Sequence, residues 1–342
     1  MDLSQLTIAL CGAAGPAGFE EAAAELIKRE ISPFVDEVKT DVMGNVIAVK
    51  RCGKENASSV LLDAHMDEVG LIVTGYVDGH LRFNSLGGVD PRMLPAREIK
   101  VLSETPLYGV ISVMPPHALS SGDMSKALGI DDLYIDIGMS DDEAKALVPV
   151  GTPCVYADGA FLLGEGSICG KSLDDRSCAA IIIKTMEALY SKEPDVDIYC
   201  LFSVQEEIGL RGAVTGAFGA EPDYAIILDV TFGKTPDVPD YKCLKMGGGP
   251  AIGVGPNTNR AFTKKIIDKA VEKGIDYQLE VLPGNSGTNA WAIQTSRIGV
   301  ATALVSLPLK YMHSPVETML ISDGEKIVSL LSEFLSDAGE VL

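Results

Sequence analysis

Near-continuous apolar segments constrain the fold of this chain more than any other feature. The most prominent lie at 57–65, 195–204, 223–230 and 299–307. Segments with the apolar spacing of amphipathic helices alternate with them, at 18–31, 176–192, 260–274 and 324–339. Buried strands that alternate with amphipathic helices are typical of a sheet covered on both faces. The sequence therefore predicts an α/β fold with a mixed central sheet and helices on both of its faces.

The region between about 70 and 165 has a different character. It contains short alternating segments with frequent turn signals, such as Asp78-Gly79 between two such segments. Only 141–148 in this region has helical spacing. Short strands separated by turns are typical of an all-β domain. We therefore expect a discontinuous α/β domain, 1–69 and 166–342, with an inserted β-barrel-like domain at 70–165.

Charge and cysteine content narrow the class of protein. The chain has 342 residues, with 28 Lys and Arg against 48 Asp and Glu, a formal net charge of −20. Nucleic-acid binding requires a concentrated positive surface, so this balance argues against it. The seven cysteines form no CxxC pair, no apolar run reaches 18 residues and no signal peptide is evident. We expect a cytoplasmic protein that binds neither nucleic acid nor membranes.

Acidic and imidazole side chains follow apolar segments at five places in the chain. They are His65, Asp174, Glu207, Asp229 and His313. Because open α/β sheets bind ligands at the carboxyl ends of their strands, one sheet could bring these five together. Two imidazoles and three carboxylates would hold two metal ions if one carboxylate bridges them. Mixed nitrogen and oxygen ligation suits zinc, cobalt or manganese.

Two further carboxylates accompany this set. Asp67 lies two residues after His65, so period-two spacing places it on the same side, where it can orient a metal-bound imidazole. Glu206 and Glu207 stand side by side one residue after the apolar segment 195–204. In a strand, adjacent side chains point to opposite faces. We therefore expect the two glutamates to have different roles.

Each of these residues also has a simpler interpretation when it is taken alone. Glu206 and Glu207 could form a solvated turn, and Asp174 could cap a helix. Asp229 could end its strand in an Asx turn, and His313 could be a surface histidine. All of these interpretations would have to hold together, at the ends of five apolar segments. The metal site is the more economical hypothesis.

Five motifs in this order resemble a known family. They are LDAHMDEVG, LDDRSC, VQEEIGLRGA, ILDV and YMHSPVE. Together they are similar to the cytosolic dinuclear-metal aminopeptidases, which include glutamyl, deblocking and tetrahedral (TET) aminopeptidases, some of them labelled endoglucanases. The resemblance covers nearly the whole chain. It implies a zinc-peptidase-like catalytic domain with two divalent ions, most readily zinc or cobalt, that releases N-terminal residues from short peptides with a free N-terminus.

The resemblance also implies a role for each candidate residue. Asp174 would bridge two ions, one completed by His65 and Asp229 and the other by Glu207 and His313. Asp67 would orient His65, Glu206 would act as the general base, and the peptide bond between Asp174 and Asp175 would be cis. The inserted domain would serve dimerisation, with dimers built into a dodecamer.

Two departures from the family pattern leave the preferred N-terminal residue open. The chain has Asn289 in a segment that is commonly GTDA in the family, and Lys310 where the family commonly has Arg. Other functions also stay open on the sequence alone. They are another amide hydrolase, such as a deacylase or carboxypeptidase, a glycoside hydrolase that uses two carboxylates, and a metal-storage or scaffold protein.

Overall fold

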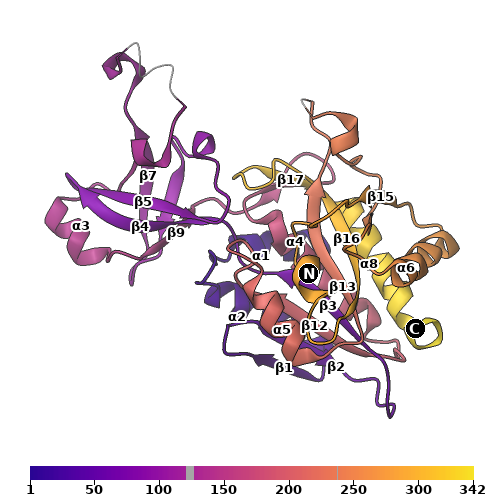
Figure 1. Cartoon of the computed structure of the whole chain (residues 1–342). Coiled ribbons are helices and arrows are strands. Elements are labelled where there is room, and N and C mark those ends of the chain that lie inside the picture. The colour runs from indigo at the N-terminus through magenta and orange to yellow at the C-terminus, as the bar shows by residue number, and fades with distance from the viewer. Residues whose placement is uncertain (121–126, 237) are drawn as a thin grey trace.

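An 11-stranded mixed sheet forms the centre of the larger domain in the structure, a computed structural model that describes residues 1–120, 127–236 and 238–342 (Figure 1). Its strands are β1 (Glu37–Thr40), β2 (Val46–Lys50), β3 (Ser59–His65), β10 (Phe161–Leu162), β11 (Ser167–Gly170), β12 (Asp197–Ser203), β13 (Tyr224–Phe232), β14 (Ala251–Val254), β15 (Gln278–Val281), β16 (Ala301–Lys310) and β17 (Glu317–Leu320). Their order is β1-β2-β12-β3-β13-β16-β17-β11-β10, and β14 pairs with both β16 and β15. The neighbours β12, β3, β13 and β16 are all parallel, so their carboxyl ends meet at one edge of the sheet.

Helices cover both faces of this sheet. One face carries α1 (Leu3–Gly12), α2 (Glu21–Ile31), α4 (Leu173–Leu189), α6 (Arg260–Lys273) and α8 (Ile321–Ser336), which is followed by α9 (Ala338–Val341). The other face carries α5 (Arg211–Ala220) and α7 (Ala290–Ile293). Strand β3 shows why there are two cores, because Val60 and Leu62 pack on the first face while Leu61 packs on the second. The predicted fold class is confirmed.

A closed barrel forms the inserted part of the chain. Its strands are β4 (Gly70–Val77), β5 (His80–Leu86), β6 (Glu98–Val101), β7 (Leu107–Val113), β8 (Leu133–Asp136) and β9 (Pro153–Tyr156), with helix α3 (Asp141–Leu147) packed against it. Asp78 and Gly79 form the β4–β5 turn, both with positive φ, as this dipeptide favours. The barrel has its own apolar core and projects from the α/β domain (Figure 1).

Short 3₁₀ turns complete the described secondary structure. They are η1 (Ser32–Phe34), η2 (Pro91–Met93), η3 (Pro116–Ala118), η5 (Ile130–Asp132) and η6 (Asp240–Lys242). In the parts of the chain that the structure describes, no helix is both long enough and apolar enough to cross a membrane.

The first turn of α4 departs from helical geometry. Ser172 before it has a φ of 54°, and Asp174 and Asp175 have non-helical backbone angles. The peptide bond between the two aspartates is cis, as the family resemblance implies. This turn lies close to the carboxyl end of β3, since Asp174 contacts His65, and both aspartates are buried.

Candidate metal centre

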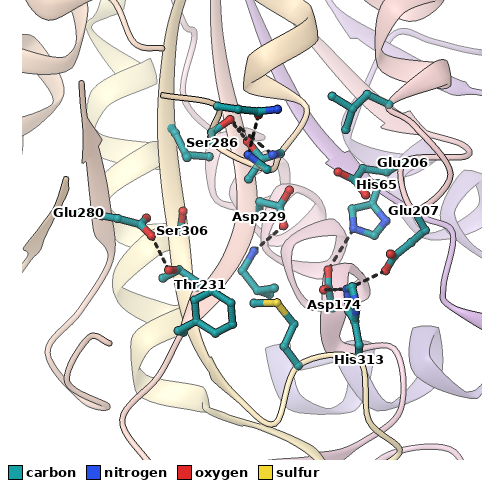
Figure 2. Close-up of a pocket in the computed structure, with 18 of the residues that line it drawn as sticks. His65, Asp174, Glu206, Glu207, Asp229, Thr231, Glu280, Ser286, Ser306 and His313 are labelled. Atoms are coloured by element: carbon teal, nitrogen blue, oxygen red, sulfur yellow. Dashed lines mark hydrogen bonds and ion pairs between the residues drawn. The ribbon is translucent and has the colours of Figure 1, made fainter. Parts of the chain in front are cut away.

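The five candidate ligands lie around one pocket at the carboxyl ends of the parallel strands. His65 is the last residue of β3, Asp229 lies in the second half of β13, and Asp174 belongs to the first turn of α4. Glu207 follows β12, and His313 follows β16. All five line a cavity of about 550 Å³, and Figure 2 shows them facing one another across it. His65 and His313 are 248 positions apart in the sequence, and the fold brings them into the same pocket.

Asp174 stands between the two imidazoles. Its Oδ1 is 3.0 Å from Nε2 of His65, and its Oδ2 is 3.2 Å from Nε2 of His313 (Figure 2). The Oε1 atom of Glu207 is 3.3 Å from the same His313 nitrogen. The Asp174 carboxylate therefore directs one oxygen to each imidazole, which is the arrangement that a bridging ligand requires.

Two groups of ligand atoms are tight enough to hold an ion. His65, Asp174 and Glu207 offer atoms that all lie within 4.8 Å of one another, and so do His65, Asp175 and Asp229. The structure therefore groups Asp229 with Asp175, which the sequence analysis did not select. The carboxylate oxygens of Asp175 are buried and have no hydrogen-bond partner among the described residues.

The electrostatics of the cluster suit cations. Burial, followed by the neighbouring Asp175 and Asp174, raises the pKa of Asp229 well above its usual range. Burial also acts to raise the pKa of Asp174, but hydrogen bonds with His313 and His65 outweigh it and lower that pKa. The two imidazoles thus stabilise only part of the buried negative charge. Divalent ions bound by these oxygen and nitrogen atoms would neutralise the remainder, so the donor set fits a metal centre.

Asp67 connects the first imidazole to the turn that carries the glutamates. Its backbone oxygen is 3.1 Å from Nδ1 of His65, and its Oδ1 is 3.3 Å from the same nitrogen. The carboxylate also accepts hydrogen bonds from the backbone N–H groups of Glu206 at 2.9 Å and Glu207 at 3.1 Å. One fully buried side chain thereby fixes the ring of His65, with Nε2 facing the pocket, and the position of both glutamates.

The reason given above for separating Glu206 from Glu207 was wrong. Strand β12 ends at Ser203, and Gln205 has a φ of 55°, so the two glutamates belong to a turn rather than to a strand. Both side chains line the pocket instead of pointing to opposite faces of the sheet. Their contacts still differ: Glu207 approaches His313, whereas no hydrogen bond or ion pair joins the Glu206 carboxylate to another described residue.

Two supporting groups were missed by the sequence analysis. Glu317, which is 2% exposed, accepts hydrogen bonds from the backbone N–H of His313 at 2.7 Å and of Asp174 at 3.1 Å. Its signal was present, because this glutamate ends the YMHSPVE motif. The carbonyl oxygen of Gly88 lies 3.1 Å from Nδ1 of His313. Gly88 belongs to the loop after β5 of the barrel, and no local pattern links it to a histidine so distant in sequence.

Comparison with known proteins agrees with this geometry. The sequence pattern of the family described as M42 glutamyl aminopeptidase matches residues 44–330. A lysyl aminopeptidase of Pyrococcus furiosus is 36% identical over 94% of this chain and 94% of its own length.

Solved structures lead to the same family. An aminopeptidase of the archaeon Desulfurococcus kamchatkensis has a TM-score of 0.90 and 32% identity, over 98% of this chain and 94% of that one. The TET1 peptidase of Pyrococcus horikoshii has a TM-score of 0.85 and 33% identity, over 98% of this chain and 99% of that one. It is described as able to assemble into a tetrahedron or a large octahedral shell. The chain is a peptide hydrolase, and it belongs to the M42 glutamyl aminopeptidase family.

Proposed function

We propose that the protein is a dinuclear metal-dependent aminopeptidase that removes N-terminal residues from short peptides. The observation that carries the proposal is the position of Asp174 between His65 and His313, with the carboxylate of Glu206, unpaired among the described residues, in the same pocket. The family and the aminopeptidases among its relatives support the reaction class.

Five side chains would hold two divalent ions, with zinc or cobalt favoured and manganese a further candidate. His65, Asp174 and Asp229 would bind one, and Asp174, Glu207 and His313 the other. When bound, such ions lower the pKa of a water molecule towards neutrality and polarise the scissile carbonyl. Asp67 would keep Nε2 of His65 directed at its ion through the contacts to Nδ1.

Glu206 would act as the general base. Its carboxylate would take a proton from the attacking water at one oxygen and then deliver that proton to the leaving amine. Burial raises its pKa to about 8, with His65 acting in the opposite direction and Glu207, Asp174 and Asp67 adding to the rise. A carboxylate that no other side chain engages, in a buried pocket, is suited to accept and return a proton.

The experiment that tests this proposal compares two substrate series after reconstitution with zinc, cobalt or manganese. Peptides with a free N-terminus should be cleaved one residue at a time, and the same peptides with an N-acetyl group should not. Removal of the metal with a chelator should abolish the activity, and added metal should restore it. Cleavage of N-acetylated peptides would favour a deacylase or carboxypeptidase instead, and chelator-resistant hydrolysis of glucans would favour the glycosidase.

We further propose that the barrel, within residues 70–165, mediates dimerisation and that dimers assemble into a dodecamer. The barrel projects from the α/β domain (Figure 1). Its strand β7 exposes apolar side chains, among them Tyr108, Val110 and Val113. The Pyrococcus horikoshii relative is described as able to assemble into a tetrahedron or a large octahedral shell, which supports the proposal. Analytical ultracentrifugation should find twelve copies per particle, and a fully active monomer would contradict it.

A further inference from the structure

A second carboxylate occupies the wall of the pocket opposite the candidate metal ligands. Glu280 projects from β15, whose alternation leaves Leu279 and Val281 exposed and turns Glu280 inward. Figure 2 shows its side chain beside Thr231 and Ser306, across the cavity from Asp174. Nothing in the proposed reaction uses this group.

Glu280 has no charged partner among the residues that the structure describes. Its Oε1 accepts a hydrogen bond from the hydroxyl of Thr231 at 2.5 Å, and the hydroxyl of Ser306 lies beside the carboxylate (Figure 2), but no ion pair joins it to another described residue. Burial raises the pKa of Glu280, while Thr231 and Ser306 act to lower it. Within the described part of the chain, no Lys or Arg lines the pocket. A half-buried carboxylate that lines the pocket, with hydroxyl groups but no cation among its described neighbours, is placed to receive a cation from outside the chain.

The strand register sets the distance of this group from the metal ligands. Thr231 lies two residues after Asp229 on β13, which is about 6.6 Å along a strand. Ser306 is the register partner of Asp229 on the neighbouring β16. The Glu280 carboxylate contacts Thr231. A lysine side chain has a four-carbon stem, so in its extended form it spans about the distance from the candidate metal ligands to this carboxylate.

We propose that Glu280 receives the ammonium or guanidinium group of a basic N-terminal residue, so that the enzyme prefers peptides that begin with Lys or Arg. This inference rests on the proposed aminopeptidase function. The apolar lining of the same pocket, Phe232, Leu304 and Met312, would cover the methylene stem of that residue. An acidic N-terminal residue would meet the Glu280 carboxylate without any cation to offset the repulsion. The preference would thus differ from the glutamyl specificity in the name of the family.

The kinetic test uses aminoacyl substrates that differ only in the N-terminal residue. Lysine and norleucine have stems of similar length, so their ratio of kcat/KM isolates the terminal charge. The wild type should favour lysine over norleucine, and Glu280→Gln, which keeps the size of the side chain, should lower that ratio by about 10- to 100-fold, the range expected for a hydrogen bond to a charged group. Asp276→Asn serves as the control, because it removes one exposed negative charge just before β15 and lies outside the pocket.

A binding measurement separates this inference from the proposed function. Calorimetric titration with free L-lysine, L-norleucine and L-glutamate requires no turnover, and only lysine binding should weaken in Glu280→Gln. Activity retained on norleucine substrates would show that the variant is folded. If the wild type cleaves norleucine or glutamate substrates as well as lysine ones, or if Glu280→Gln leaves the ratio and lysine binding unchanged, the inference is overturned while the aminopeptidase stands. If no free-amine substrate is cleaved with any metal, the proposed function itself fails.

Discussion

A single methyl group on the barrel loop should weaken metal binding in the α/β domain. A Cβ atom added at Gly88 would lie 2.8 Å from Nδ1 and 3.2 Å from Cε1 of His313. The first distance falls about 0.6 Å short of the 3.4 Å at which ordinary contact begins, so the imidazole has to withdraw in Gly88→Ala. Catalytic groups must be held within about 0.5 Å of their productive position, so this displacement is large enough to matter.

The expected loss of metal affinity follows from the contact that the added methyl group displaces. Moving the ring also breaks its 3.1 Å contact with the carbonyl oxygen of Gly88. Loss of such an outer partner of a metal ligand typically costs about 10- to 100-fold in metal affinity. We therefore expect one of the two proposed ions to bind that much more weakly in Gly88→Ala. Turnover at saturating metal should stay closer to that of the wild type, because Glu206 and Asp67 lie outside the change.

The assay is competition between the protein and a fluorescent chelator, which gives both dissociation constants. Gly75→Ala is the matched control, because Gly75 is in the same barrel, does not have positive φ, and has no atom within 4 Å of the added Cβ. It should bind both ions like the wild type. If Gly88→Ala also retains wild-type affinity for both ions, the claim that the barrel loop supports the metal centre is refuted.

Two further predictions concern stability. Glu20, whose Oε1 accepts hydrogen bonds from the backbone N–H groups of Gly18 at 2.7 Å and Gln205 at 3.1 Å, has its pKa raised by burial from 4.5 to about 7. Because folding raises this pKa, the protonated carboxyl of Glu20 favours the folded state. Its contribution to the free energy of unfolding is complete below pH 4.5 and is lost as the pH rises through 7. Urea titrations should therefore show the wild type losing stability relative to Glu20→Gln between pH 5 and pH 8, and parallel curves would contradict this. Arg176 is fully buried, pairs with Glu68 and donates to carbonyl oxygens including that of Leu10 at 2.8 Å. Lys171, 2.6 Å from Glu68, keeps that carboxylate paired in Arg176→Met, so the main loss is that of the hydrogen bonds to buried carbonyl oxygens. Each carbonyl left without a partner costs about 1–3 kcal/mol, so the variant should lose about 3–5 kcal/mol in urea unfolding, and a loss below about 1 kcal/mol would show that the network contributes little.

The sequence identified the central strands because their apolar content is unambiguous. The segments 57–65 and 195–204 contain β3 and β12, the segment 223–230 covers all but the last two residues of β13, and each segment ends near a polar residue of the pocket. Parallel pairing then brings these ends together, which is why a list of strand-end residues could anticipate a cluster.

Helix α5 was not anticipated, and its glycines explain why. The segment RGAVTGAFGA contains three glycines, which lower helix propensity. The structure uses two of them for close packing, because a Cβ at Gly212 would lie 2.4 Å from the carbonyl oxygen of Val204 and one at Gly216 would lie 2.6 Å from Leu201. Tertiary packing, which no local pattern encodes, decides this element.

The supporting contacts of the site were beyond the sequence for a similar reason. The turn at Gln205 ends the alternation of β12 earlier than the apolar pattern suggested. Gly88 and His313 are separated by 225 positions, and the inward direction of Glu280 depends on the pairing of β15 with β14. Strand identity is local, whereas the side chains that meet in a pocket depend on how distant strands pair.

The most direct test of the proposed mechanism measures bound metal and turnover together in Glu206→Gln and Glu207→Gln. Glu206→Gln should retain both ions and lose about 10²- to 10⁴-fold in turnover, because it removes the proton acceptor. Glu207→Gln replaces a charged ligand near His313 with a neutral one, so it should lose occupancy at that ion and recover part of its rate with excess metal. A Glu206→Gln protein that loses its metal, beside a Glu207→Gln protein that stays loaded but inactive, would reverse the two roles. Full activity in both variants would contradict the mechanism.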